Sequence, residues 1–367
     1  MMAEVTMPLR RYKPGGAVKK CFQHGVATLS RRPALAYVGG WLGKQNLGDE
    51  VLLDACQHLF PALQILPFDG GRLSVGLTRV SPIYRAGLLG GGTLIGMDRI
   101  FAESAETFLR VHPNLIIFGT GVDTAKLLGK NGSAREWLPL LKRCNIAGVR
   151  GPDSAAALAE VGMPGVAVIG DPVLAFACKD INPSFVPKSI GLNIGASDGS
   201  YWAEGERVQR EITQLALQAR KAGWRVEWLV VMPRDLPCIQ KAAEESGTAE
   251  KIHLIYDDHT KFMEATRSLS VFVGMKLHAT LLATCALTPS VMLEYRPKCL
   301  DYMKSIGQEA ATVRTDDFTA DRVWEMARNW NARRNEMATT LARGIHPLQE
   351  KQRALAEKIA RDLTTRE

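Results

Sequence analysis

Short apolar segments alternate with helical patterns along most of this chain, and this alternation limits the possible folds more than any other feature. The first apolar segment is residues 34–38, and the alternation continues to about residue 317. Strands that are separated by helices form mainly parallel sheets with helices on both faces. The sequence therefore predicts an α/β protein, and its 367 residues are enough for about two domains.

A segment with two prolines and mixed polarity interrupts the alternation near the middle of the chain. The expected parts are a basic N-terminal tail (1–33), an N-terminal Rossmann-like domain (34–175), a linker (176–188), a C-terminal Rossmann-like domain (189–317) and C-terminal helices (318–367). Gly344 and Pro347 predict a break in the last part. Two Rossmann-like domains that face each other enclose a central cleft, which is the default place for a site.

The most informative segment is residues 270–298, which reads as a strand, a helix and a second strand. Five polar side chains follow the two strands: Lys276 and His278 after the first, and Tyr295, Arg296 and Lys298 after the second. Both places lie at the carboxyl edge of a parallel sheet, where open α/β folds bind ligands. Cationic side chains beside a helix N-terminus predict a site for a small, multiply charged anion.

Two glycine-rich loops follow strands in the first half of the chain. The first leads into a helix within residues 39–55 and contains Asn46 and Asp49. Asp49 has a sufficient structural role as the N-cap of that helix. Alternatively, Asn46 donates a hydrogen bond to a ligand and Asp49 accepts a proton from a ligand hydroxyl. In the second loop, Gly91 and Gly92 would let a ligand or the opposing domain approach the backbone closely.

Arg150 and Asp171 each follow a predicted strand and are further candidates for the cleft. Three interpretations of Arg150 stay open: it bridges the two domains, it pairs with Asp171, or it clamps a carboxylate or phosphate. His278 lies among cationic side chains, where like charge lowers its pKa and a bound polyanion would raise it again. Such a pKa suits a general acid near neutral pH.

Several features bear on location and partners. The seven cysteines are scattered, which is typical of reduced thiols in the cytosol, and no spacing indicates a metal site. The start of the chain lacks the apolar core of a signal peptide, so we expect a cytoplasmic protein. Residues 1–32 hold seven Lys or Arg and one acid, which predicts a solvated tail or contact with an anionic membrane face. No nucleic-acid motif accompanies these charges, so nucleic acid is not an expected partner.

Six motifs, taken together, resemble the polysaccharide pyruvyl transferase family. They are GKQNLGDE (43–50), LGGGTL (89–94), VRGPDS (149–154), GDP (170–172), GMKLHA (274–279) and YRPK (295–298). The motifs occur in the family's order, and the resemblance spans about residues 36 to 307. Two positions depart from the family pattern: Lys276 stands where Arg is more frequent, and Leu287 stands where Gly is usual.

The resemblance implies a fold of the glycosyltransferase-B type and a reaction with phosphoenolpyruvate as co-substrate. Members of the family transfer the pyruvyl group of phosphoenolpyruvate to two hydroxyls of one sugar, which forms a ketal and releases phosphate. The residues implied to bind the donor are Arg150, His278 and Lys298, and Lys276 is a further candidate. His278 would protonate the donor and Asp49 would act as base. The other cleft candidates are Asn46, Gly91, Gly92, Asp171, Tyr295 and Arg296.

The resemblance also implies partners. The acceptor, expected on the N-terminal domain, would be a glycan or its lipid-linked precursor, which places the protein in polysaccharide biosynthesis and allows peripheral contact with the inner membrane face. No metal or redox cofactor is expected. A sugar-nucleotide glycosyltransferase is the rival enzyme, but Leu282 occupies the position where those enzymes use Glu to hold the nucleotide ribose. A non-catalytic subunit of a glycan-assembly complex is the other alternative.

Overall fold

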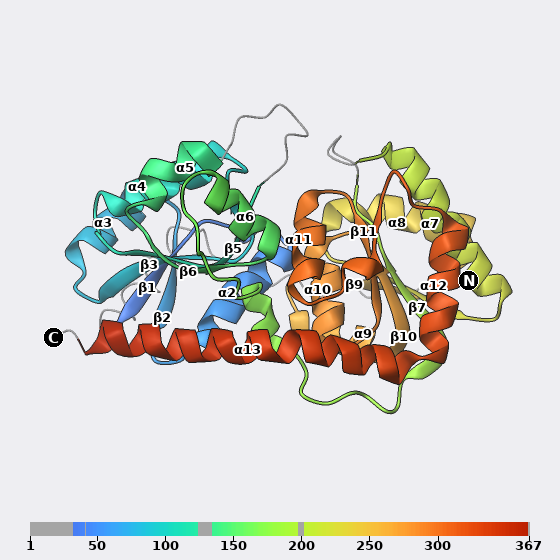
Figure 1. The fold of residues 1–367 in the computed structure, drawn as a ribbon. Helices are drawn as coiled ribbons and strands as arrows, with labels where there is room; N and C mark the ends of the chain where they lie inside the picture. Colours follow the sequence, from blue (N-terminus) through green and yellow to red (C-terminus); the bar gives the residue numbers. More distant parts are fainter. Residues whose placement is uncertain (1–31, 41, 124–133, 197–201, 366–367) are drawn as a thin grey trace.

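The computed structural model of the chain describes residues 32–40, 42–123, 134–196 and 202–365. Within these ranges the strands form two six-stranded sheets, and every strand pairing is parallel. The sheets lie side by side and helices cover them above and below (Figure 1). The prediction of an α/β protein with two Rossmann-like halves is confirmed.

The first sheet has the strand order β2-β1-β3-β5-β4, and β6 also pairs with β5. Its strands are β1 (Ala34–Val38), β2 (Gln64–Phe68), β3 (Tyr84–Gly90), β4 (Thr93–Ile95), β5 (Leu115–Val122) and β6 (Asn145–Val149). Its helices are α2 (Leu47–Leu59), α3 (Arg72–Val80), α4 (Arg99–Leu109), α5 (Ala134–Leu141) and α6 (Pro152–Glu160). All residues of β1 and β5 are buried. These strands read as continuous apolar runs because helices cover both faces of the sheet.

The second sheet has the order β12-β11-β10-β7-β8-β9. Its strands are β7 (Val186–Asn193), β8 (Arg225–Val230), β9 (Ile252–Leu254), β10 (Leu269–Gly274), β11 (Ser290–Glu294) and β12 (Thr312–Arg314). Its helices are α7 (Gly205–Lys221), α8 (Leu236–Glu245), α9 (His259–Arg267), α10 (Leu277–Cys285), α11 (Pro297–Ser305) and α12 (Ala320–Ala332). The short 3-10 helices are η1 (Pro172–Phe176), η2 (Pro233–Asp235) and η3 (Glu309–Ala311). The predicted strand–helix–strand unit is therefore β10-α10-β11.

An apolar contact joins the two halves near the carboxyl edges of the sheets. One hydrophobic cluster contains Leu47 and Val51 of α2 together with Leu277 and Leu281 of α10. Helix α10 buries eight of its nine residues, which is why its sequence is apolar all round rather than amphipathic. The contact fixes the start of α2 against the start of α10.

The C-terminal helix α13 (Arg334–Thr364) runs along both halves of the molecule (Figure 1). The predicted break near Gly344 and Pro347 is wrong, because α13 continues through both residues. Gly344 serves packing instead: a Cβ atom there would collide with the carbonyl oxygen of Ile306. Further along, the Gln352 side-chain amide donates to the carbonyl oxygens of Ile169 and Asp171 at 2.9 and 2.8 Å. These tertiary contacts outweigh the helix-breaking tendency of the sequence.

The turn between α10 and β11 explains one departure from the family pattern. Leu287 has a φ of 57°, in the left-handed region that favours glycine, and its side chain is fully buried. The turn therefore keeps the backbone conformation that glycine would adopt freely, and leucine adds apolar contacts to the core.

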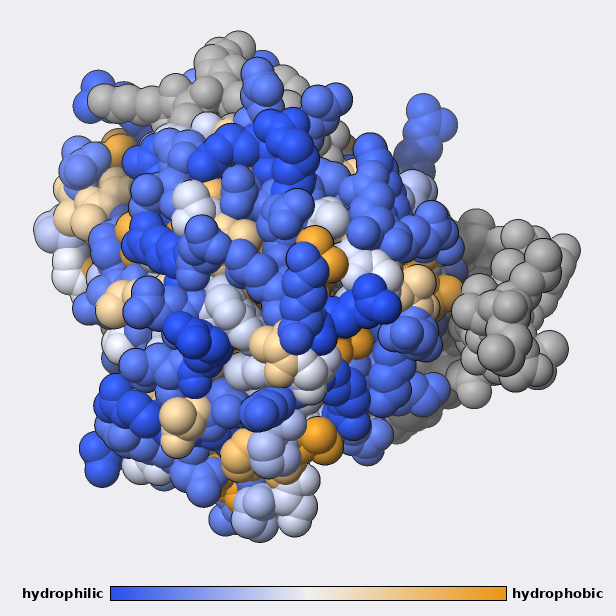
Figure 2. Space-filling view, turned by 90° about the vertical axis from the view of Figure 1, so that its right-hand side faces the viewer, coloured by the Kyte–Doolittle hydropathy of each residue, from blue (hydrophilic) through white to orange (hydrophobic). Residues whose placement is uncertain are grey.

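Hydrophilic side chains dominate the outer face of the C-terminal half, where apolar residues occur only in small groups (Figure 2). None of the helices within the described ranges combines the length and hydrophobicity of a membrane span. The basic tail lies almost entirely outside the described residues.

Candidate active site

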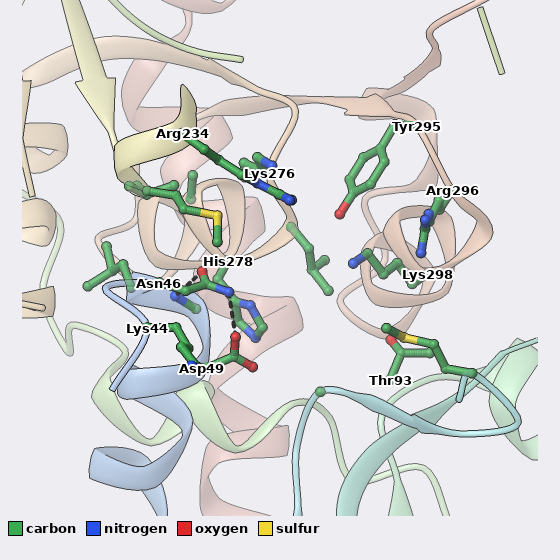
Figure 3. Close-up of a pocket in the computed structure, with 18 of the residues that line it drawn as sticks. Lys44, Asn46, Asp49, Thr93, Arg234, Lys276, His278, Tyr295, Arg296 and Lys298 are labelled. Carbon is green, nitrogen blue, oxygen red and sulfur yellow. Dashed lines mark hydrogen bonds between the residues drawn. The ribbon is translucent and has the colours of Figure 1, made fainter. Parts of the chain in front are cut away.

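A cavity of about 520 Å³ opens between the two halves, at the carboxyl edges of both sheets. Polar lining residues from the first half are Lys44, Asn46, Asp49 and Thr93, with the backbone of Gly48 and Gly92. Those from the second half are Arg234, Lys276, His278, Tyr295, Arg296 and Lys298. Figure 3 shows these side chains on opposite sides of one space.

Positive charge dominates the cavity wall. Among the described lining residues, five are Lys or Arg and one, Asp49, is acidic. Lys44 and Arg234 are not among the residues that the sequence motifs predict for the site. Arg234 follows β8 at the same sheet edge as the predicted residues, so the edge rule could have found it. Lys276 is partly neutralised, because its Nζ lies 3.3 Å from Oδ1 of the buried Asp235.

His278 is the second residue of α10, and Lys276 is the N-cap of that helix. The imidazole lies beside Asn46 and Asp49 of the facing half (Figure 3). Burial, followed by the positive charges of Lys298 and Arg150, lowers the pKa of His278 to about 3. The ring is therefore neutral at pH 7 in the ligand-free protein. Burial contributes more to the low pKa of His278 than the like charge of its neighbours, which is the cause that the sequence indicates.

Lys298 lies in the first turn of α11, and its Nζ is 5.0 Å from the centroid of the Tyr295 ring. Burial is the largest cause that lowers the pKa of Lys298 to about 8, and the charges of Arg296 and Arg150 lower it further. In Figure 3 the Tyr295 hydroxyl points toward the cavity. A partly desolvated ammonium group of this kind gains free energy when an anion binds beside it.

The start of α2 differs from one interpretation of the sequence. Asn46, not Asp49, is the N-cap of α2, because the helix begins at Leu47. The side-chain oxygen Oδ1 of Asn46 accepts a hydrogen bond from the Gly48 N–H at 3.2 Å. The Asn46 amide also donates to Asp49 Oδ2. Asp49 therefore needs no capping role, and its carboxylate is held by Asn46 at the cavity wall.

Arg150 does not line the cavity, although it lies directly behind it. Its side chain is fully buried and donates to the Gly92 carbonyl oxygen at 3.1 Å, the Thr93 hydroxyl at 2.9 Å and Asp301 Oδ2 at 3.3 Å. Asp301 belongs to α11 in the other half. Of the three interpretations of Arg150, this geometry matches the bridge between domains.

The Asp301 carboxylate binds the start of α6 as well as Arg150. It accepts from the backbone N–H groups of Asp153 and Ser154 at 3.0 and 3.1 Å and from the Ser154 hydroxyl at 2.7 Å. A Cβ atom on Gly151 would collide with Asp301, so glycine is needed for this approach. The contact joins α6 of the first half to the helix that carries Lys298.

Of the predicted residues Gly91, Gly92 and Asp171, only Gly92 lines the cavity. Gly92 lines the cavity, whereas Gly91 has a φ of 73° and makes room for the Leu52 side chain of α2. Asp171 is fully buried behind His278 and does not reach the cavity. Within the part of the chain that the structure describes, no group of three or more His, Cys, Asp or Glu side chains is arranged to hold a metal ion.

Several solved structures resemble this chain over most of its length. S. aureus MnaA in a co-structure with UDP has a TM-score of 0.58 at 11% identity, with 89% of this chain and 94% of that chain covered. A UDP-glucosyltransferase from Polygonum tinctorium has a TM-score of 0.51 at 11% identity, with 91% and 99% covered. These similarities show a fold of the glycosyltransferase-B type. A search of curated protein sequences finds no significant match.

The family comparison agrees with the order of motifs in the sequence. The model of the family described as polysaccharide pyruvyl transferase matches residues 46–297, which is most of the chain and includes both sides of the cavity. The fold, the match and the motifs around the cavity lead to one identification: this chain belongs to the polysaccharide pyruvyl transferase family.

Proposed function

We propose that this protein transfers the pyruvyl group of phosphoenolpyruvate to two hydroxyls of one sugar in a glycan or its lipid-linked precursor. The observation that carries the proposal is that His278 and five cationic side chains line one cavity. Phosphoenolpyruvate carries a phosphate and a carboxylate on one carbon, so binding it takes several cationic groups in a small space. Membership of the family supports the same donor.

Lys298 and Arg296 are the proposed donor-binding residues on one side of the cavity, with Lys276 as a further candidate. They lie at the start of α10 or α11, where the positive end of a helix also favours an anion. Arg150 adds positive charge from behind the cavity. Direct contact between Arg150 and the donor would require Asp301 to release the guanidinium.

His278 is the proposed general acid. Bound phosphoenolpyruvate, a trianion, would offset some of the surrounding positive charge and so raise the pKa of His278 from its ligand-free value of about 3. Transfer of a proton to the methylene carbon forms the methyl group and makes the carbon that bears the phosphate oxygen electrophilic. One sugar hydroxyl then attacks that carbon, and Asp49 is the proposed base for its proton.

The second hydroxyl completes the ketal when phosphate leaves. Of the two protons that the acceptor gives up, one ends on the new methyl group through His278 and Asp49, and the other leaves with phosphate. The balance needs no oxidant or reductant. The chain supplies cationic binding, a proton donor and a proton acceptor, all within one cavity.

Calorimetric titration with phosphoenolpyruvate, UDP and a UDP-sugar tests the proposal. We expect phosphoenolpyruvate alone to bind, and Lys298→Ala to weaken it by at least tenfold. A matched control is Lys304→Ala, which lies on the same helix but pairs with Asp153 outside the cavity. Binding of UDP alone would instead indicate a sugar-nucleotide enzyme, although Leu282 is buried in the core and cannot hold a ribose.

The low pKa of Lys298 predicts that donor binding depends on pH. Lys298 is charged below a pKa of about 8 and neutral above it, so the affinity for phosphoenolpyruvate should fall as pH rises through that value. The titration would be repeated from about pH 7 to about pH 9.5. Lys298→Arg keeps its charge across this range and should flatten the dependence. An unchanged decline in this variant would assign the effect to another group.

A further inference from the structure

A second carboxylate lies on the buried side of His278. Asp171 is fully buried and caps η1, because its Oδ1 accepts from the Val173 N–H at 3.2 Å. Its Oδ2 atom has no hydrogen-bond partner among the described residues, and it lies 3.8 Å from His278 Nε2. The capping bond fixes the carboxylate, so its free oxygen stays directed at the imidazole.

The facing nitrogen is also without a partner. His278 Nε2 is buried and makes no hydrogen bond within the described part of the chain. A buried polar atom without a hydrogen bond destabilises the fold, and an approach of about 1 Å would let these two atoms bond to each other. Because a carboxylate oxygen only accepts, the nitrogen that faces it must carry the hydrogen.

The other ring nitrogen lies on the cavity side. A Cβ atom placed on Gly48, whose backbone lines the cavity, would lie 2.5 Å from His278 Nδ1. Because residue 48 is glycine, no side chain at that position of the cavity wall covers Nδ1. The two nitrogens of the ring have different environments: Nε2 is buried against a carboxylate, and Nδ1 lies next to Gly48 at the cavity wall.

From this geometry we infer that Asp171 is a positioning residue that holds His278 as the Nε2–H tautomer, so that Nδ1 is the nitrogen that exchanges protons in the cavity. The catalytic consequence rests on the proposed function, but the tautomer itself does not. In the reaction, Nδ1–H of the imidazolium gives its proton to the methylene carbon and a C–H bond forms from the C=C electron pair. The ring returns to neutral with its hydrogen on Nε2, and Asp171 keeps its charge.

Charged and titratable groups surround this pair from several elements. Lys298 and Arg150 lower the pKa of His278, and Arg150 and Asp301 act on Asp171. Asp171 in turn raises the pKa values of four buried groups, Tyr37, Cys56, Cys285 and Tyr302. Lys298 reaches the cavity, Asp49 lies beside the ring at the cavity wall, and Arg150 and Asp301 bind each other. Asp171 is thus the carboxylate with an unpaired oxygen directed at the ring.

Nitrogen-15 NMR of the ligand-free protein near pH 7 tests the tautomer directly. We expect the wild-type His278 ring to show a protonated Nε2 and an unprotonated Nδ1, with the signals assigned by their absence in His278→Gln. Asp171→Asn keeps the oxygen that caps η1 but presents an amide donor to the ring, so the hydrogen should move to Nδ1. A wild-type ring with its hydrogen on Nδ1, or the same tautomer in both proteins, would overturn the inference.

Kinetics of Asp171→Asn test the consequence. We expect kcat to fall by about 10²–10⁴-fold while phosphoenolpyruvate affinity changes by less than about fivefold. The pH above which kcat declines should also become lower, because the protonated His278 ring no longer has the Asp171 carboxylate beside it. A purely structural defect would lower kcat without changing that pH. Asp153→Asn, at the surface pair with Lys304, is the control. Failure of the wild type to bind phosphoenolpyruvate would reject the proposed function and leave the tautomer result standing.

Discussion

His278→Gln is expected to lower kcat by about 10²–10⁴-fold, the usual contribution of a general acid, and to leave the fold intact. The side chain is only 16% exposed, and glutamine nearly fills its volume without offering an acidic proton. Donor binding should change much less than kcat, because Lys298, Arg296 and Lys276 supply the charge at the cavity wall. The measurement is release of phosphate from phosphoenolpyruvate in the presence of acceptor, beside calorimetric titration of the donor.

The control for this variant is His58→Gln. His58 is exposed near the C-terminal end of α2, on the opposite end of the helix from Asn46 and Asp49. A separation of about nine residues from Asp49 and about 12 from Asn46 places it roughly 14 Å and 18 Å along the helix from them. Its replacement should leave both kcat and donor affinity unchanged. Retention of activity in His278→Gln would exclude the imidazole as proton donor and favour a binding role for the cavity.

Asp301→Ala is expected to destabilise the protein by about 3–5 kcal/mol, the usual effect of removing one partner from a buried ion pair. The carboxylate accepts from Arg150 and from the first turn of α6, so its loss leaves a buried guanidinium unpaired and a helix start uncapped. The midpoint of urea denaturation, followed by circular dichroism, measures the effect.

Lys304→Ala is the matched control for stability. It removes a second link between the same two helices, Lys304 Nζ to Asp153 Oδ1 at 2.8 Å, but both side chains are more than a third exposed. Such a pair contributes less than about 1 kcal/mol. An effect of Asp301→Ala no larger than that of Lys304→Ala would show that the bridge between α6 and α11 adds little to stability.

The residues that sequence alone grouped correctly share one property: each follows a strand. Lys276, His278, Tyr295, Arg296 and Lys298 all line the cavity, as the carboxyl-edge rule predicts. The rule works because direction along a parallel strand is a local property. The same rule placed Arg150 and Asp171 near the site, but it could not say that Arg150 lies behind Gly92 and Thr93, or that Asp171 lies behind His278.

The partner of Arg150 could not be predicted, because Asp301 is 151 residues away and lies in the other half of the molecule. For the same reason the sequence did not reveal that Asp235 pairs with Lys276, 41 positions further along the chain. For helix α13 the sequence predicted a break that the structure does not have. Gly344 and Pro347 read as a break in isolation, yet Ile306 explains the glycine and contacts with both halves keep the helix continuous.

The alternating strands and helices, the parallel sheets, and the cationic groups that follow β10 and β11 can all be predicted from the sequence. These features depend on side-chain periodicity and on chain direction, which act over a few residues. Which charges remain available to a ligand depends on how the two halves pack together. Arg150 pairs with Asp301 of the other half, and Asp171 lies 3.8 Å from His278. Lys298 stays at the cavity, where burial lowers its pKa to about 8. Desolvation and ion pairing depend on all the atoms that surround a group, so they are fixed only when both halves have come together.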